Sequence, residues 1–164
     1  METSLRADEE IVRVYNKYSD MVYRIAFLML ENSAEAEDIL QNVFIKYIKI
    51  NKNFESDEHL KAWLIVCAKN AAKDVLKSFW HRKKVSIESM GEHILSESMS
   101  TEKSDVYLAV MRLKDKYRIP LYLHYYEGYK TFEIANILSL NHATVRSRLR
   151  TARQKLKLYL EEEE

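Results

Sequence analysis

Turn-forming residues are scarce in this sequence. Its 164 residues include two glycines, Gly91 and Gly128, and one proline, Pro120. A sheet protein of this size would need many more, because Gly supplies the positive φ angles of tight turns and Pro presets their first φ angle. Hydrophobic residues make up 47% of the chain and charged residues 31%, a composition that can bury a core. The sequence therefore predicts an all-α fold.

Charges are segregated along the chain, although the net charge is only +1. Residues 69–84 hold six cations and one acid, and residues 142–160 hold six cations and no acid. Between them, residues 85–105 hold five acids and one cation. Two basic segments joined by an acidic connector indicate two contacts with one long polyanion. Solvated helix faces without a ligand would have the same charges, so charge alone leaves both interpretations open.

Three helices are expected in the first part of the chain, over residues 11–30, 34–50 and about 57–82. Ser33 is expected to cap the second helix, and Ser56 or Asp57 to begin the third. Apolar residues of the third helix repeat at helical spacing and form its expected core face: Leu60, Trp63, Leu64, Cys67, Ala71, Val75 and Phe79. These helices predict a first domain over residues 1–83.

Lysines spaced by four residues lie on the opposite side of the third helix. Lys69, Lys73 and Lys77 line up there as a stripe of positive charge, because residues four apart share a helix face. Such a stripe is suited to follow a nucleic-acid backbone.

The middle and the end of the chain predict a second domain. Residues 84–103 are rich in Ser and acids, and are expected to be a flexible acidic linker. Helices are expected over residues 106–113 and 120–127, with Pro120 in the first turn of the second, where proline is tolerated. The domain is expected to cover residues 104–160, and residues 161–164 an acidic tail.

The most informative segment lies at the end of this second domain. A short helix over Thr131–Leu138, a break at residues 139–141 and a basic helix over residues 142–160 predict a helix-turn-helix. Its two helices are expected to be held together by Ile134, Ala135, Leu138, Val145 and Leu149. The second helix then presents to a DNA major groove the side chains of Thr144, Arg146, Ser147, Arg148 and Arg150.

Several other classes of chemistry are disfavoured. Two glycines cannot form a G-x-G-x-x-G phosphate loop, and no two of the five histidines have local metal-ligand spacing. Cys67 is expected to be a buried structural thiol. The longest apolar run, residues 62–68, is far shorter than a membrane span, and no signal peptide is visible. We therefore expect a cytoplasmic protein that has no catalytic site, cofactor, metal or small-molecule substrate and is not itself a membrane protein.

Aromatic residues mostly fit a core interpretation. Trp63, Tyr122, Tyr125 and Tyr126 are expected to pack inside the domains, because they lie on helices with apolar faces. Phe54 and Trp80 fall outside those faces, which leaves stacking on single-stranded bases open for them.

A chain of motifs resembles the extracytoplasmic-function sigma factors of bacterial RNA polymerase, members of the sigma-70 family. The resemblance covers nearly the whole sequence, and its motifs occur in order without gaps inside them. They are Glu35-Ala36-Glu37-Asp38-Ile39-Leu40-Gln41-Asn42-Val43-Phe44, Ala62-Trp63-Leu64, Ala68-Lys69-Asn70, Tyr117-Arg118, Glu127-Gly128, Glu133-Ile134-Ala135 and Thr144-Val145-Arg146-Ser147-Arg148-Leu149.

The resemblance implies that the first domain is sigma region two, with three helices, and the second is region four, with four helices. It implies core-polymerase contacts by Glu37, Asp38, Gln41 and Asn42. It implies minus-ten contacts by Asn53, Phe54, Ser56, Lys69, Asn70, Lys73 and Lys77. It implies minus-thirty-five contacts by Thr144, Arg146, Ser147, Arg148, Arg150 and Arg153. Ser139 stands where such turns often have Gly, so Asn141 is expected to adopt the left-handed conformation instead.

The function implied is promoter-specific initiation of transcription by core RNA polymerase, with promoter DNA and an anti-sigma factor as partners. A stand-alone helix-turn-helix regulator would explain residues 104–160, but it leaves the outward Asp38 and Gln41 without a role. A sigma-like decoy that binds only an anti-sigma protein would need no basic face. All three hypotheses predict different behaviour toward core polymerase.

Overall fold

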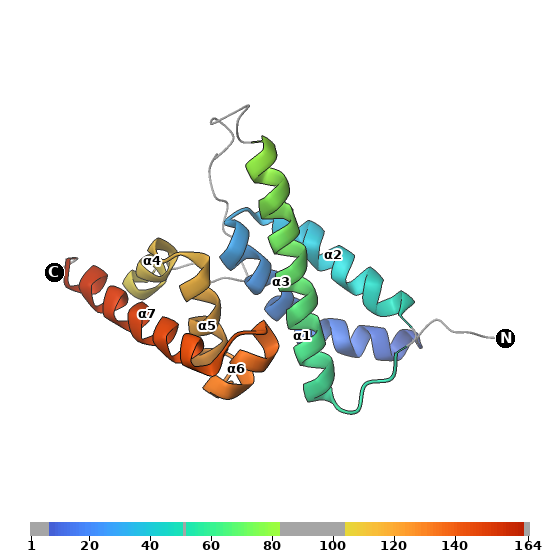
Figure 1. The fold of residues 1–164 in the computed structure, drawn as a ribbon. Coiled ribbons are helices and arrows are strands. Elements are labelled where there is room, and N and C mark those ends of the chain that lie inside the picture. The colour runs from blue at the N-terminus through green and yellow to red at the C-terminus, as the bar shows by residue number, and fades with distance from the viewer. Residues whose placement is uncertain (1–6, 51, 83–103, 163–164) are drawn as a thin grey trace. The chain divides into compact units, whose positions relative to one another are not determined.

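The computed structural model describes residues 7–50, 52–82 and 104–162, and for residues 79–82 it describes the backbone alone. All regular structure within these residues is helical, which confirms the all-α prediction. The chain divides into two compact units, residues 1–99 and 100–164 (Figure 1). The expected linker over residues 84–103 and the side chains of Phe79 and Trp80 lie outside the described residues.

The first unit contains three helices, each of which packs against the other two. They are α1 (Asp8–Leu30), α2 (Ser33–Lys49) and α3 (Asp57–Arg82). The largest side chains buried between them include Phe27, Ile25, Ile39, Tyr47, Leu64 and Ile65. The helices have one shared apolar core, which leaves their remaining faces available to partners.

The N-terminus of α2 corrects the expected cap. The cap is Asn32, whose side-chain oxygen accepts a hydrogen bond from the Glu35 backbone N–H at 2.9 Å. Ser33 is the first helical residue instead. Both residue types cap helices well, so sequence could not choose between two adjacent candidates.

The core face of α3 is also displaced from the expected stripe. The fully buried residues of this helix are Leu60, Leu64, Ile65, Ala68 and Ala72. Trp63, Cys67, Ala71 and Val75 are half-buried at the edge of that face. The reason is that α3 packs against both α1 and α2, so the face between those two neighbours is the buried one. Burial nevertheless raises the pKa of the Cys67 thiol, which disfavours its reactive thiolate form.

An ion cluster joins α1 to the start of α3. Asp57 accepts a hydrogen bond from Lys17 Nζ at 2.9 Å and one from an Arg13 guanidinium nitrogen at 3.2 Å. Ser56 caps α3 by accepting a hydrogen bond from the His59 backbone N–H at 3.1 Å. Lys17, followed by Arg13, holds the pKa of the Asp57 carboxyl below its usual value.

The second unit contains four helices: α4 (Asp105–Arg112), α5 (Asp115–Tyr125), α6 (Thr131–Leu138) and α7 (His142–Glu162). Helix α7 packs against the other three and forms the centre of the unit. It extends to Glu162, two residues into the expected acidic tail, where Glu162 pairs with Arg112 of α4 at 3.0 Å. The ion pair links the end of α7 to α4 within this acidic run.

Helix α5 begins earlier than expected, at Asp115, so Pro120 lies inside it rather than in its first turn. Pro120 is buried, and its packing offsets the helical hydrogen bond that its missing N–H cannot form. The chain reverses after α5 at Gly128, whose φ of 79° lies in the left-handed region that favours glycine. The expected core assignment of Tyr125 and Tyr126 is wrong, because their side chains are 60% and 61% exposed.

Arg118 is the buried charged side chain of the described residues. Its Nε donates to the Leu113 carbonyl at 2.5 Å, and a terminal nitrogen donates to the Met111 carbonyl at 3.1 Å. These carbonyls lie at the end of α4, where helical partners run out. Arg118 therefore joins α4 to α5, which gives this residue of the Tyr117-Arg118 motif a structural role.

The helix-turn-helix forms as expected over α6 and α7. Its five apolar residues, Ile134, Ala135, Leu138, Val145 and Leu149, are all buried. Ser139 itself adopts the left-handed conformation at φ 56°, which corrects the expectation for Asn141. Asn141 instead caps α7 by accepting a hydrogen bond from the Ala143 N–H at 2.7 Å. The turn therefore uses two short polar residues where a glycine is common.

Candidate nucleic-acid interface

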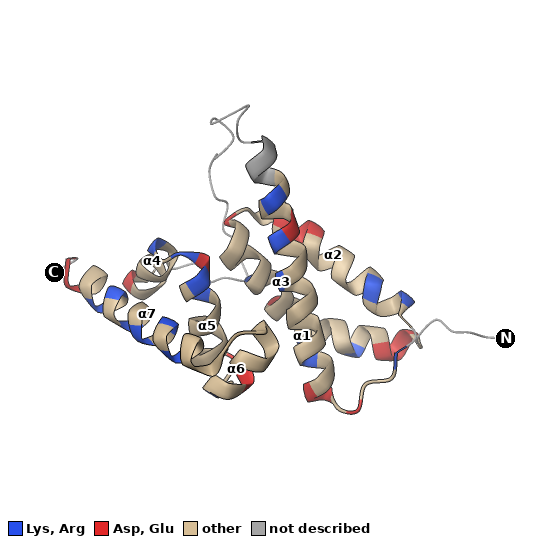
Figure 2. Ribbon diagram, in the orientation of Figure 1, with Lys and Arg blue, Asp and Glu red and all other residues tan. Residues whose placement is uncertain are grey.

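Helix α7 presents a basic face to solvent, as Figure 2 shows along its length. The cations of this helix are Arg146, Arg148, Arg150, Arg153, Lys155 and Lys157. Arg146, Ser147 and Arg150 are exposed in its first turns, opposite the buried Val145 and Leu149. They occupy the N-terminal turns, which are the part of a recognition helix that contacts base edges in helix-turn-helix proteins.

Two of the expected minus-thirty-five residues are less exposed than Arg146, Ser147 and Arg150. Thr144 and Arg148 are half-buried, because they lie on the side of α7 that faces α5. Arg153 is exposed but donates a hydrogen bond to the Tyr125 hydroxyl at 3.0 Å, which orients its guanidinium group. The six expected residues are thus on one helix but on more than one of its faces.

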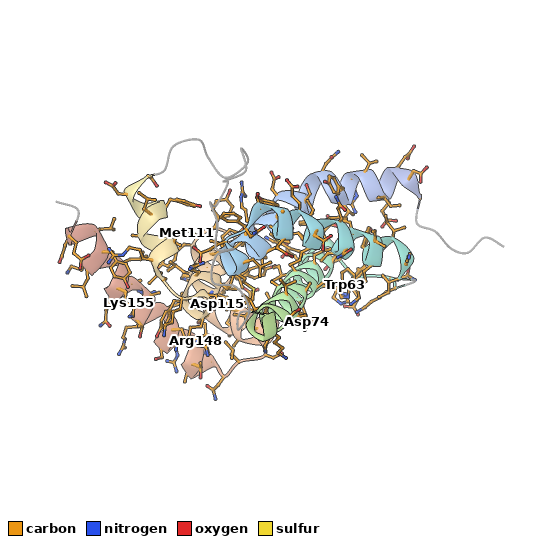
Figure 3. All side chains as sticks on the ribbon, turned by 90° about the horizontal axis from the view of Figure 1, so that it is seen from above. Trp63, Asp74, Met111, Asp115, Arg148 and Lys155 are labelled. Atoms are coloured by element: carbon orange, nitrogen blue, oxygen red, sulfur yellow. The ribbon has the colours of Figure 1, made fainter. Side chains whose placement is uncertain are left out.

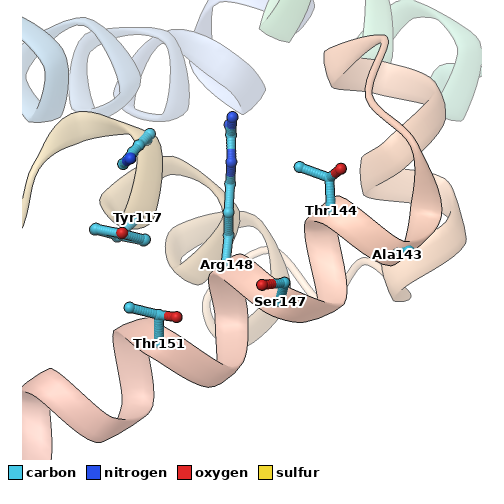
Figure 4. A pocket seen from close by; sticks show the side chains of 7 residues that line it. Tyr117, Ala143, Thr144, Ser147, Arg148 and Thr151 are labelled. Atoms are coloured by element: carbon cyan, nitrogen blue, oxygen red, sulfur yellow. The ribbon is translucent and has the colours of Figure 1, made fainter.

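A pocket of about 380 Å³ lies between the start of α5 and α7. Figure 4 shows Arg148 projecting from α7 between Tyr117 and Thr144. The lining residues are Lys116, Tyr117, Ala143, Thr144, Ser147, Arg148 and Thr151. Sequence reasoning did not single out Lys116, because the pocket exists only once α5 packs on α7.

The basic residues of α3 also differ in exposure. Asn70, Lys73 and Lys77 are exposed and share one face at spacings of three and four residues. Lys69 is half-buried, and this burial, followed by the charge of Lys73, lowers the pKa of its ammonium group. The outward stripe therefore consists of Asn70, Lys73 and Lys77, with Lys69 at its edge.

In the first unit, the loop before α3 lines a pocket of about 390 Å³. Its lining includes three loop residues, Asn53, Phe54 and Ser56. Phe54 is half-buried, and its ring centroid lies 5.4 Å from that of Trp63. Phe54 thus anchors the loop on α3, while Asn53 and Ser56 keep polar groups exposed to a ligand.

The expected minus-ten residues form two groups rather than one cluster. Ser56 and Asn70 are 14 residues apart in sequence, with α3 between them. At a rise of about 1.5 Å per residue they are separated by about 20 Å along the helix. At the 3.4 Å rise of stacked bases in a duplex this length corresponds to about six nucleotides, and to fewer nucleotides of an extended single strand. A single strand could therefore extend from the loop pocket to the lysines.

The exposed face of α2 is polar and partly acidic. Glu37, Asp38, Gln41 and Asn42 are all exposed, and their spacing places them on one face. Asn42 donates a hydrogen bond to Asp38 at 3.4 Å. Beside Gln41, an apolar groove of about 440 Å³ runs between α1 and α2, and Val12, Tyr15 and Ile45 are exposed along it. Sequence reasoning did not find this groove, since its apolar residues come from two helices.

Metal and membrane features are absent from the part of the chain that the structure describes. Within residues 7–50, 52–82 and 104–162, no three His, Cys, Asp or Glu side chains form a group that could hold a metal ion. None of the helices over these ranges is both long enough and apolar enough to cross a bilayer.

The fold and its exposed faces define a class of protein: a two-unit helical DNA-binding protein with a helix-turn-helix in its second unit. Residues 14–82 match the family Sigma-70 region 2, and residues 103–156 match Sigma-70, region 4. The chain belongs to the extracytoplasmic-function sigma factors of the sigma-70 family.

Individual relatives agree with this assignment. The chain is 32% identical over 155 residues to the ECF RNA polymerase sigma factor SigM of Bacillus subtilis strain 168, covering 90% of this chain and 93% of SigM. It is 28% identical over 159 residues to SigW of the same organism, covering 87% of this chain and 84% of SigW.

A solved structure has the same fold. The sigma factor RpoE of Bartonella quintana, crystallised with the anti-sigma factor NepR, is 21% identical and has a TM-score of 0.69. The likeness covers 93% of this chain and 98% of RpoE.

Proposed function

We propose that this chain binds core RNA polymerase through α2 and directs it to promoters through separate DNA contacts on α3 and α7. The function of a sigma factor requires both a polymerase surface and DNA-binding surfaces. The observation that carries the proposal is the exposed polar face of α2 in the same chain as two basic helices. A protein that only bound DNA would not need this face as a binding surface.

The polymerase surface consists of Glu37, Asp38, Gln41 and Asn42 on α2. Asp38 offers a carboxylate to a basic partner group, and Gln41 and Asn42 offer amide donors and acceptors. The apolar groove beside Gln41 extends this surface. An interface with an apolar part and a charged rim gives both affinity and orientation.

Minus-ten binding is assigned to the first unit. Asn53, Phe54 and Ser56 would receive an unpaired base at the loop pocket. Asn70 would contact a base further along the strand, and Lys69, Lys73 and Lys77 would contact its phosphates. This combination fits single-stranded DNA, where cations follow the backbone and a small number of polar or aromatic groups capture bases.

Minus-thirty-five binding is assigned to α7. Arg146 and Arg150 lie four residues apart with Ser147 between them, and all three are exposed. Two guanidinium groups on one face can form paired hydrogen bonds to guanine edges in the major groove. Thr144, Arg148 and Arg153 lie beside this face and would contact the backbone.

The remaining features of the proposal concern partners and location. An anti-sigma factor is an expected partner, as NepR is for the RpoE of the solved complex. The protein would act in the cytoplasm, where polymerase and DNA are found. It would have no catalytic chemistry of its own, since initiation is catalysed by the polymerase it binds.

The direct test is reconstitution of purified full-length chain with bacterial core RNA polymerase. The proposal expects a stable complex that transcribes from a subset of promoters that core enzyme alone does not use. A stand-alone regulator would bind DNA without binding core enzyme, and a decoy would bind an anti-sigma protein without directing transcription. Failure to bind core enzyme, or failure to initiate at any promoter of a genomic library, would overturn the proposal.

A further inference from the structure

The pocket between α5 and α7 contains residues that the assignments above leave without a role. Lys116 and Tyr117 come from the start of α5, and Thr151 comes from the third turn of α7. We propose that this pocket binds a phosphate group of the DNA backbone beside the minus-thirty-five element, between Lys116 and Arg148. The inference rests on the proposed function and adds a second helix, α5, to the DNA contact.

The chemistry of the lining fits a phosphate. Arg148 supplies a guanidinium group and Lys116 an ammonium group. Tyr117, Thr144, Ser147 and Thr151, each of which carries a hydroxyl, also line the pocket. Phosphate oxygens accept hydrogen bonds, and those from charged donors are the strongest. A pocket with two cations and four hydroxyl donors therefore favours a phosphate over a neutral ligand.

The charges around Tyr117 are unbalanced. Lys116 Nζ lies 5.1 Å and Lys155 Nζ 5.8 Å from the centroid of its ring. Among the described residues, no carboxylate forms an ion pair with Lys116, Arg148 or Lys155. Asp115 is half-buried next to Lys116 but does not line the pocket. Three neighbouring cations without a paired acid repel one another, and an anion placed among them would relieve this repulsion.

The pocket lies on the side of α7 that would face the edge of a major groove if the helix were inserted in it. Thr144, Ser147, Arg148 and Thr151 occur at spacings of three and four residues, so they share one side of the helix. Ser147 also borders the exposed face that carries Arg146 and Arg150. The groove is about 12 Å wide and the helix about 10–12 Å across, so the sides of an inserted helix approach the phosphate rows. The pocket is therefore on the side that meets backbone while the exposed face meets bases.

Figure 3 shows how the pieces of this site are distributed: Arg148 and Lys155 lie on α7, and Asp115 marks the start of α5. Because the helix-turn-helix itself consists of α6 and α7, a contact from α5 would be additional to it. It would fix the angle at which α7 enters the groove. Arg148 then acts as a backbone contact, and base discrimination is left to Arg146, Ser147 and Arg150.

The first test measures the salt dependence of DNA binding. Full-length chain is assembled with core polymerase and bound to the tightest duplex recovered from a library randomised at the minus-thirty-five element. Loss of one phosphate contact reduces the slope of log affinity against log salt by about 0.9 for duplex DNA. We expect this reduction for Lys116→Gln, with the ranking of library sequences unchanged. Lys114→Gln removes the same charge from an exposed residue two positions away that does not line the pocket, and should leave the slope unchanged.

The second test locates the phosphate. Single phosphates of the duplex are replaced one at a time by uncharged methylphosphonate. The unaltered protein should lose affinity at one linkage beside the minus-thirty-five bases. The Lys116→Gln variant should bind the duplex with methylphosphonate at that linkage almost as tightly as it binds the unmodified duplex, because this variant already lacks the phosphate contact. Equal losses for the variant and the unaltered protein at every linkage would overturn the proposal.

A free anion is the alternative source of the same phosphate chemistry. Inorganic phosphate is titrated into the full-length chain, and the amide signals of residues 115–117 and 147–148 are followed by NMR. One outcome is that phosphate binds at these residues while Lys116→Gln leaves the salt dependence of DNA binding unchanged. The pocket would then be a site for a free anion and not a DNA contact, which would overturn the inference. If the unaltered holoenzyme bound no promoter duplex at all, the proposed function would fail first. If the unaltered holoenzyme bound promoters normally and Lys116→Gln left the salt slope unchanged, only the proposed phosphate contact in the pocket would be rejected.

Discussion

The two units of the chain distribute their charges differently. The first unit has two distinct polar faces: the partly acidic face of Glu37, Asp38, Gln41 and Asn42 lies on α2, and the stripe of Asn70, Lys73 and Lys77 lies on α3. The second unit concentrates six cations on α7, four of which are arginines. Arginine can pair with guanine edges through two hydrogen bonds, whereas lysine acts as a flexible point charge. The comparison suggests that the first unit binds protein and DNA backbone on separate helices, and that the second unit supplies duplex sequence discrimination.

The largest expected effect tests the protein-binding half of this comparison. Asp38→Ala removes a carboxylate from the exposed face of α2. Loss of one partner of a charge pair that becomes buried in an interface costs about 2–5 kcal/mol. We therefore expect core-polymerase affinity to fall strongly in a direct binding titration. Asp74→Ala, which removes an exposed acid from α3, is the matched control and should bind as tightly as the unaltered chain. If Asp38→Ala, Asp74→Ala and the unaltered chain bound core polymerase with equal affinity, the assignment of this face of α2 to the polymerase interface would be wrong.

The next effect tests base discrimination by α7. Arg146→Ala should reduce preference at one minus-thirty-five position, because a paired hydrogen bond to guanine contributes about 1–3 kcal/mol of discrimination. Arg153→Ala should instead weaken binding about equally on all sequences, because a phosphate contact contributes affinity without sequence preference. Binding of both variants to a library of upstream elements makes the comparison. A uniform loss for Arg146→Ala, with unchanged ranking, would show that Arg146 contacts only backbone.

A smaller effect is expected for the lysines of α3. Lys73→Gln and Lys77→Gln should each reduce the salt slope of binding to single-stranded minus-ten DNA by about 0.7. Asn70→Ala should leave that slope unchanged and alter the preferred minus-ten sequence, since an amide discriminates bases without adding charge. Lys49→Gln, an exposed change on α2, is the control for loss of a distant charge. If Asn70→Ala changed affinity equally for all strands, α3 would have only a backbone role.

The smallest effect separates structural acids from binding acids in the first unit. Lys17, then Arg13, lowers the pKa of Asp57, so the ionised carboxylate is favoured in the folded protein. The stability it contributes is present above the unfolded pKa of about 3.9 and is lost as pH falls through the folded value. Asp57→Asn should therefore lower the urea midpoint slightly at pH 7, and the difference should shrink as the solution is acidified through the lowered pKa of Asp57.

Asp20→Asn is the control for that measurement, because Asp20 is exposed on α1 and forms no ion pair among the described residues. It should change the midpoint less than Asp57→Asn does at pH 7. A difference between Asp57→Asn and the unaltered chain that persisted unchanged at low pH would mean that the cluster does not stabilise the fold through its charge.

Local sequence features predicted much of this architecture. The scarcity of Gly and Pro and the helical spacing of apolar residues predicted an all-α chain, and the turn at residues 139–141 was placed correctly. These features depend on interactions between residues close in sequence, which repeat every three or four positions. The family resemblance followed from motifs of the same local kind.

Tertiary packing decided what periodicity could not. It buried Ile65, Ala68 and Ala72, which were not predicted in the core face of α3, and it exposed Tyr125 and Tyr126. It also half-buried Arg148 in a pocket that Lys116 lines, so that residues of one basic helix acquired different surroundings. Sequence determined which residues are charged and which segments are helical, because both are local properties. Which side of each helix is covered depends on neighbours distant in the chain, and only the packed structure brings those neighbours together.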